Sequence, residues 1–117
     1  MYPLYENESS IFHIEKRENG AVSVFVKTRG FSGEYEYCIE PENLQSYLRT
    51  LEEFDLKEQG EFYFRDMDSD SFVLFQKTQY GHMNIKGQLG STFQNNYLIF
   101  EMEADQTLIQ RVIQVLR

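Results

Sequence analysis

The chain has 117 residues, of which 19 are acidic and 11 basic, so its formal net charge is −8 at pH 7. Such a charge repels nucleic acid and anionic membranes, which argues against both as partners and favours a basic protein. A hydrophobic fraction of 41%, with ten phenylalanines and eight tyrosines, excludes a disordered composition and is ample for a folded core.

The length predicts a single domain over residues 1–117. No apolar run approaches the length of a membrane span, and the polar start of the chain lacks the pattern of a signal peptide. The single cysteine, Cys38, rules out an intrachain disulfide. Together these features favour a cytoplasmic protein.

Three strands are expected first, and the second has the clearest pattern. Residues 21–27 alternate, with three valines on one face, and Asn19-Gly20 before them suits the positive φ of a hairpin turn. A shorter apolar run over 11–15 precedes that turn. Residues 31–40 form the third strand, with aromatic side chains on one face and glutamates on the other.

A helix is expected next, because Pro41 has a fixed φ that suits a first helical turn. Apolar residues recur at helical spacing and mark one buried stripe: Leu44, Tyr47, Leu48, Leu51 and Phe54. Gly60 is the expected stop.

Four more strands and a second helix complete the chain. The strands are expected near residues 61–65, 71–77, 83–89 and 98–103, with polar turns between them. Asp105 is a suitable N-cap for the last helix. The apolar stripe of that helix consists of Leu108, Ile109, Val112, Ile113 and Leu116.

The predicted order is therefore βββαββββα. Strands that are segregated in this way, with two helices packed against them, predict an α+β fold. We expect a largely antiparallel, curved sheet of about seven strands, with both helices packed on one face.

The acidic charge is concentrated in one third of the sequence. Residues 34–70 hold twelve acids and three bases, a net charge of −9 against about +1 for the rest. Several acids crowd the C-terminal end of the first helix, where each opposes the helix dipole by about 0.3–1 kcal/mol: Glu52, Glu53, Asp55 and Glu58. This arrangement favours an acidic docking surface, with solubility alone as the alternative interpretation.

No residue pattern indicates catalysis, a metal or a cofactor. Residues 66–70 place aspartates as in the first half of a calcium loop, but the required glycine and glutamate are absent, so a solvated turn is expected. His13, His82 and Cys38 lack the spacing of a metal site, and the acids beside Cys38 disfavour its thiolate. An enzyme with a carboxylate–histidine site built on His82 is an alternative hypothesis.

Two segments of the second half carry a family resemblance: GHMNI at residues 81–85 and LIFEMEADQTL at residues 98–108, which leads into the last helix. With FSG at residues 31–33 and the leucine-rich first helix in the same order, the chain resembles the WapI-type immunity proteins over roughly three quarters of its length. These are small cytoplasmic bacterial proteins that neutralise the toxin domains of polymorphic toxin systems. The resemblance implies protein binding without catalysis.

We therefore expect a non-catalytic cytoplasmic protein that holds a basic toxin domain on an acidic surface. Acids would steer the partner by charge and tyrosines would anchor it. The candidate partner-binding residues are Glu36, Glu40, Tyr47, Glu52, Glu53, Asp55, Glu58 and Tyr63. The alternative is a homodimeric small-ligand-binding or regulatory domain, paired through an exposed sheet edge or face.

Overall fold

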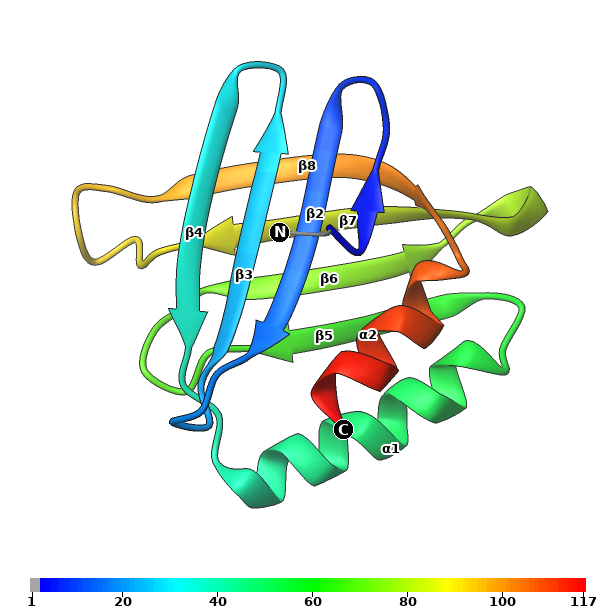
Figure 1. The fold of residues 1–117 in the computed structure, drawn as a ribbon, viewed down its shortest axis with the longest axis horizontal. Helices are drawn as coiled ribbons and strands as arrows, with labels where there is room; N and C mark the ends of the chain where they lie inside the picture. The colour runs from blue at the N-terminus through cyan, green and yellow to red at the C-terminus, as the bar shows by residue number, and fades with distance from the viewer. Residues whose placement is uncertain (1–2) are drawn as a thin grey trace.

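A computed structural model describes residues 3–117 and shows two antiparallel sheets of four strands each. The first sheet has the order β1 (Tyr5–Glu6), β2 (Ser10–Lys16), β3 (Val22–Thr28) and β4 (Phe31–Tyr37). The second has the order β5 (Gly60–Arg65), β6 (Phe72–Lys77), β7 (His82–Leu89) and β8 (Leu98–Asp105). The strands of one sheet cross those of the other at a steep angle (Figure 1).

The core lies between the two sheets, where each buries its apolar face. Val22, Val24 and Val26 of β3 are fully buried, as their alternation predicts. Phe12 of β2 and Phe75 of β6 meet edge to face across the interface, with ring centroids 5.9 Å apart. The sheets therefore form a sandwich with near-orthogonal strands.

The two helices lie together at one side of this sandwich (Figure 1). Helix α1 (Pro41–Asp55) packs against β5 and against α2 (Leu108–Leu116), which in turn contacts β2. Their buried stripes are those the spacing predicts: Leu44, Leu48, Leu51 and Phe54 in α1, and Leu108, Ile109, Val112, Ile113 and Leu116 in α2. The helices thus touch both sheets and seal the core between them.

The predicted α+β class and the order of the long elements are confirmed, but the prediction of one curved sheet is wrong. The chain forms two sheets because α1 separates two sets of strands, and each set has one apolar face that the other can cover. Residues 3–117 form eight strands rather than seven because Tyr5–Glu6 adds a short edge strand to β2. Alternation identifies the buried face of a strand, but not which strand lies beside it.

Neither helix in the part of the chain that the structure describes is long and apolar enough to cross a bilayer.

Candidate functional site

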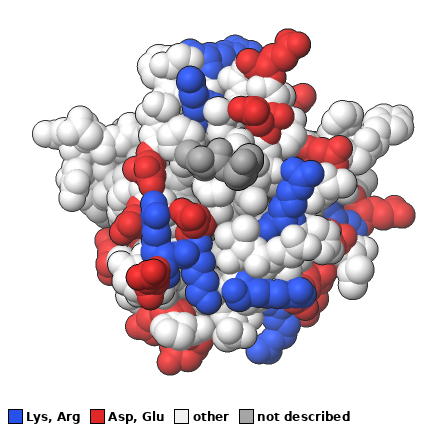
Figure 2. Space-filling view, in the orientation of Figure 1, with Lys and Arg blue, Asp and Glu red and all other residues white. Residues whose placement is uncertain are grey.

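Glu36 lies on the outer face of the first sheet among other charged residues. The Arg17 guanidinium contacts the carboxylates of Glu34 at 3.0 Å, Glu15 at 3.2 Å and Glu36 at 3.7 Å. Figure 2 shows basic and acidic side chains interspersed over this side of the molecule. The acids of β4 therefore belong to a mixed surface in which each exposed ion pair contributes little.

The predicted acids of α1 are spread along the helix rather than gathered at one point. Glu40 precedes the first turn, and Glu53 is exposed about 20 Å further along. Glu52 pairs with Arg117 at 3.2 Å, and Asp55 is half-buried and accepts a hydrogen bond from Gln110. Within residues 3–117, Glu53 forms no ion pair, so its charge faces solvent uncompensated.

A buried cation from the second sheet caps the C-terminal end of α1. Lys77 Nζ donates to the carbonyl oxygens of Phe54 at 2.6 Å, of Asp55 at 3.1 Å, and of Lys57. Burial lowers the pKa of Lys77, an effect that the charge of Asp55 opposes. The crowding of acids at this helix end is thus offset by a distant cation, and by itself it no longer argues for a docking surface.

Two further acids of the acidic segment, both in the turn after β5, hold loops in place. Asp66 is buried and accepts hydrogen bonds from the Cys38 N–H at 2.8 Å and the Tyr35 hydroxyl at 3.1 Å. Asp70 accepts from the Thr92 N–H at 3.0 Å and from its hydroxyl, and these bonds lower the pKa of Asp70. The turn is polar as predicted, but it is not fully solvated, because Asp66 is buried and both carboxylates are occupied by internal bonds.

The two predicted tyrosine anchors lie in different environments. Tyr47 is half-buried beside Phe64, with ring centroids 5.1 Å apart, and its hydroxyl accepts the Arg65 N–H at 3.3 Å. Tyr63 is 41% exposed on the outer face of the second sheet, with the Arg65 guanidinium 4.8 Å from its ring centroid. Tyr47 therefore packs α1 against β5, while Tyr63 belongs to a surface that the acids of α1 do not share.

Of the groups considered for chemistry, His82 and Cys38 are exposed and His13 is half-buried in β2, and the three do not converge on a metal site. His82 faces Asp105 across β7 and β8, with both side chains open to solvent and lacking the desolvation typical of a general base. Cys38 is exposed, and a hydrogen bond with Asp68, with a smaller effect from burial, raises its pKa and disfavours the thiolate. Among residues 3–117 no three His, Cys, Asp or Glu side chains are placed to hold a metal ion.

Tyr80 is the most exposed aromatic side chain of the described residues. It is 92% exposed in the 3-10 turn η1 (Gln79–Gly81), which joins β6 to β7. Its backbone is left-handed, with φ 61° and ψ 36°. This conformation costs about 1–2 kcal/mol for a residue other than glycine. The fold therefore maintains a strained turn that presents a tyrosine to solvent, a combination found at functional sites.

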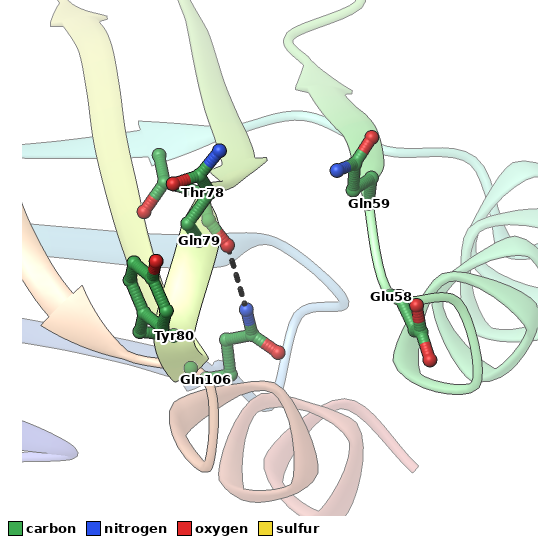
Figure 3. A pocket seen from close by; sticks show the side chains of 7 residues that line it. Glu58, Gln59, Thr78, Gln79, Tyr80 and Gln106 are labelled. Carbon is green, nitrogen blue, oxygen red and sulfur yellow. Dashed lines mark hydrogen bonds between the residues drawn. The ribbon is translucent and has the colours of Figure 1, made fainter.

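Tyr80 borders an open concavity of about 440 Å³ between the β6–β7 turn and the loop after α1. Figure 3 shows Glu58 across this concavity from Tyr80, and Gln106 beneath the turn. The Gln106 side chain donates to the carbonyl oxygens of His82 at 3.0 Å and of Thr78 at 3.4 Å, which supports the turn from below. The remaining lining residues are Gln59, Thr78, Gln79 and Gly81.

An aromatic side chain above amides and one carboxylate can bind a polypeptide surface, with the ring as an apolar anchor and the amides as hydrogen-bonding groups. Of the predicted partner-binding residues, only Glu58 lines this concavity. The sequence predicts the turn at Tyr80-Gly81, but it does not show that the tyrosine itself adopts the left-handed conformation. A tyrosine within a polar turn, as in QYGH at residues 79–82, is the signal that points to this site.

Comparisons with protein families, with curated proteins and with solved structures found no match. The resemblance to the WapI-type immunity proteins is therefore still a prediction.

Proposed function

We propose that this protein is a non-catalytic cytoplasmic binding module that neutralises a basic protein partner, as an immunity protein does a toxin domain. The observation that carries the proposal is Tyr80, a strained and almost fully exposed tyrosine beside a polar concavity. Tyrosines that are buried on binding are among the residues that contribute most to interfaces. The concavity lacks a cluster of titratable groups, which favours recognition over chemistry.

Electrostatics supports a basic partner at this end of the molecule. Glu58 lines the concavity, and Glu53 lies in the last turns of α1, which lead into the loop carrying Glu58. Neither carboxylate forms an ion pair within residues 3–117. On a chain with a net charge of −8, such acids raise the rate at which a cationic partner is captured, by an amount that falls with added salt.

The binding test uses immobilised protein and lysate of the source cells, read by mass spectrometry at low and at high ionic strength. Wild-type protein should retain one basic protein at stoichiometric level. Tyr80→Asn should weaken that binding by roughly thirtyfold, as expected for a central anchor. Its thermal stability should stay equal or rise, because asparagine tolerates the left-handed conformation better than tyrosine.

A charge-reversal pair tests the electrostatic part. The double variant E53K/E58K should slow association and flatten its salt dependence, while E8K/E18K, with the same change in net charge at exposed sites elsewhere, should bind like the wild type. If Tyr80→Asn and E53K/E58K both bind as the wild type does, this surface is not the interface. Recovery of the protein alone would contradict the proposal and favour the homodimeric alternative.

A further inference from the structure

Strand β8 has an unprotected edge. It is the last strand of its sheet and pairs only with β7, in an unbroken register over eight residues. Among residues 3–117, no backbone hydrogen bond reaches its other side. Natural proteins usually protect such an edge with charged side chains, especially lysine, with a proline or a bulge, or with a covering element. β8 has no proline, lysine or bulge, and all its charged side chains are acidic, so its row of free N–H and C=O groups is open to a strand that brings basic side chains.

The free edge runs along a groove of about 730 Å³. Its other wall consists of the ends of the two hairpins of the first sheet, at residues 7–10 and 28–31, which extend past β8 in Figure 1. Two exposed apolar side chains line the groove: Phe31, 67% exposed, and Ile99, 68% exposed. Glu101 and Glu103 follow Ile99 along the outer face of β8.

We infer that this groove receives an extended segment of a partner protein, which pairs with β8 as an added strand and carries basic residues at alternate positions. Addition of a strand satisfies the free backbone groups of an edge, and its alternate side chains give specificity. On the outer face, the added side chains lie opposite Ile99, Glu101 and Glu103, so lysine or arginine fits two successive positions there. The site is separate from the concavity beside Tyr80, and the inference does not depend on the proposed function.

A second copy of the chain is a poor occupant for reasons of charge. A two-fold axis would place β8 antiparallel to itself. The two registers that pair the strand most fully put Glu101 opposite either the other Glu101 or Glu103, and like charges in that position are destabilising. Each copy also carries a net charge of −8. A basic segment has neither disadvantage.

The test uses synthetic peptides, calorimetry and hydrogen exchange. An N-acetylated peptide of alternating lysine and valine should bind the full chain and slow exchange of alternate amides in β8. Two peptides with methylated backbone nitrogens are the matched controls. One carries the methyl group on the backbone nitrogen of every lysine, and the other on the backbone nitrogen of every valine. Because backbone N–H groups also alternate in direction along a strand, one version should lose binding and the other should keep it.

A charge swap assigns the site. E101K/E103K should weaken binding of the lysine–valine peptide by about tenfold and allow a glutamate–valine peptide to bind. The control E18K/E42K, which makes the same change in net charge at exposed sites outside the groove, should change neither. Three results would each overturn the inference: equal binding of a peptide with the same lysines grouped at one end, equal binding of both N-methylated peptides, or a dimer in which β8 is protected without any peptide.

Discussion

Replacing Lys77 with methionine removes the cation that caps α1 while keeping the apolar stem. The ammonium donates to three carbonyl oxygens at the C-terminal end of the helix, and the oxygen of Phe54 is the most deeply buried of the three. The Lys77 ammonium also lies 4.9 Å from the centroid of the Phe54 ring. Methionine fills similar space but offers these oxygens no donor.

The stability that Lys77→Met should lose follows from these contacts. Leaving the buried oxygen of Phe54 unpaired costs about 1–3 kcal/mol, and removing a partly buried cation from a helix C-terminus costs about 1–2 kcal/mol. The lost cation–π contact adds about 0.5–1 kcal/mol. Relief of the desolvation of a buried ammonium opposes these losses. We expect a net destabilisation of about 2–4 kcal/mol, which lowers Tm by roughly 8–16 °C in a domain of this size.

Urea unfolding followed by circular dichroism measures this difference in the free energy of unfolding. The control is Lys57→Met, which removes an exposed lysine from the loop that Lys77 holds and should change stability by less than about 0.5 kcal/mol. A Lys77→Met variant that is as stable as the control, or more stable than the wild type, would refute the assignment of Lys77 as the cap of α1.

Two further predictions concern loops and packing. Since hydrogen bonds from Thr92 lower the pKa of Asp70 in the folded state, its carboxylate stabilises the fold above its ordinary pKa of about 3.9, and this contribution is lost as pH falls through the lowered value. Asp70→Asn should therefore be less stable than the wild type in urea at neutral pH, with the difference vanishing in acid; a constant difference would contradict this. Gly87→Ala should cost about 1–3 kcal/mol, because the added Cβ would lie 2.6 Å from the Phe100 ring and 2.7 Å from the Phe72 carbonyl oxygen. Phe100→Leu should partly rescue that variant while destabilising the wild type, and strictly additive effects on Tm would contradict the clash with the ring.

Short-range patterns in the sequence predicted the elements well. The valines of β3 and the leucines of α1 are buried as their periods of two and 3.6 residues indicate. The N-cap predicted at Asp105 is wrong, because Thr107 precedes α2 while Asp105 ends β8 and its carboxylate accepts the Thr107 N–H at 2.9 Å in the intervening turn. The buried faces depend on neighbours within one element, so local chemistry is sufficient to identify them.

The pairing of the two sheets could not be predicted from alternation alone. A close approach such as that of β4 to residue 98 depends on Gly33, where an added Cβ would lie 3.0 Å from the Leu98 side chain. Nothing near Gly33 in the sequence indicates that the first leucine of β8 lies against it. Contacts of this kind link residues that are distant along the chain, and they set the number of sheets.

The candidate site shows the same division between local and distant information. Counting acids over residues 34–70 locates the negative charge, but Asp66 is buried, and Lys77 neutralises a helix end that local sequence leaves without a cation. What distinguishes a docking charge from a structural one is the absence of an internal partner, and this is a property of the folded chain.

Glu53 and Glu58 meet that criterion, since each is exposed and forms no ion pair among residues 3–117. Tyr80 is the corresponding case for an apolar anchor, because within residues 3–117 its ring has no packing partner that would explain the strained backbone and is exposed to solvent. A turn selected for stability alone would place glycine or asparagine at a left-handed position. If Tyr80→Asn stabilises the fold and weakens binding of the partner, the strain is explained by recognition. If it stabilises the fold and leaves binding intact, the tyrosine has no role in the interface.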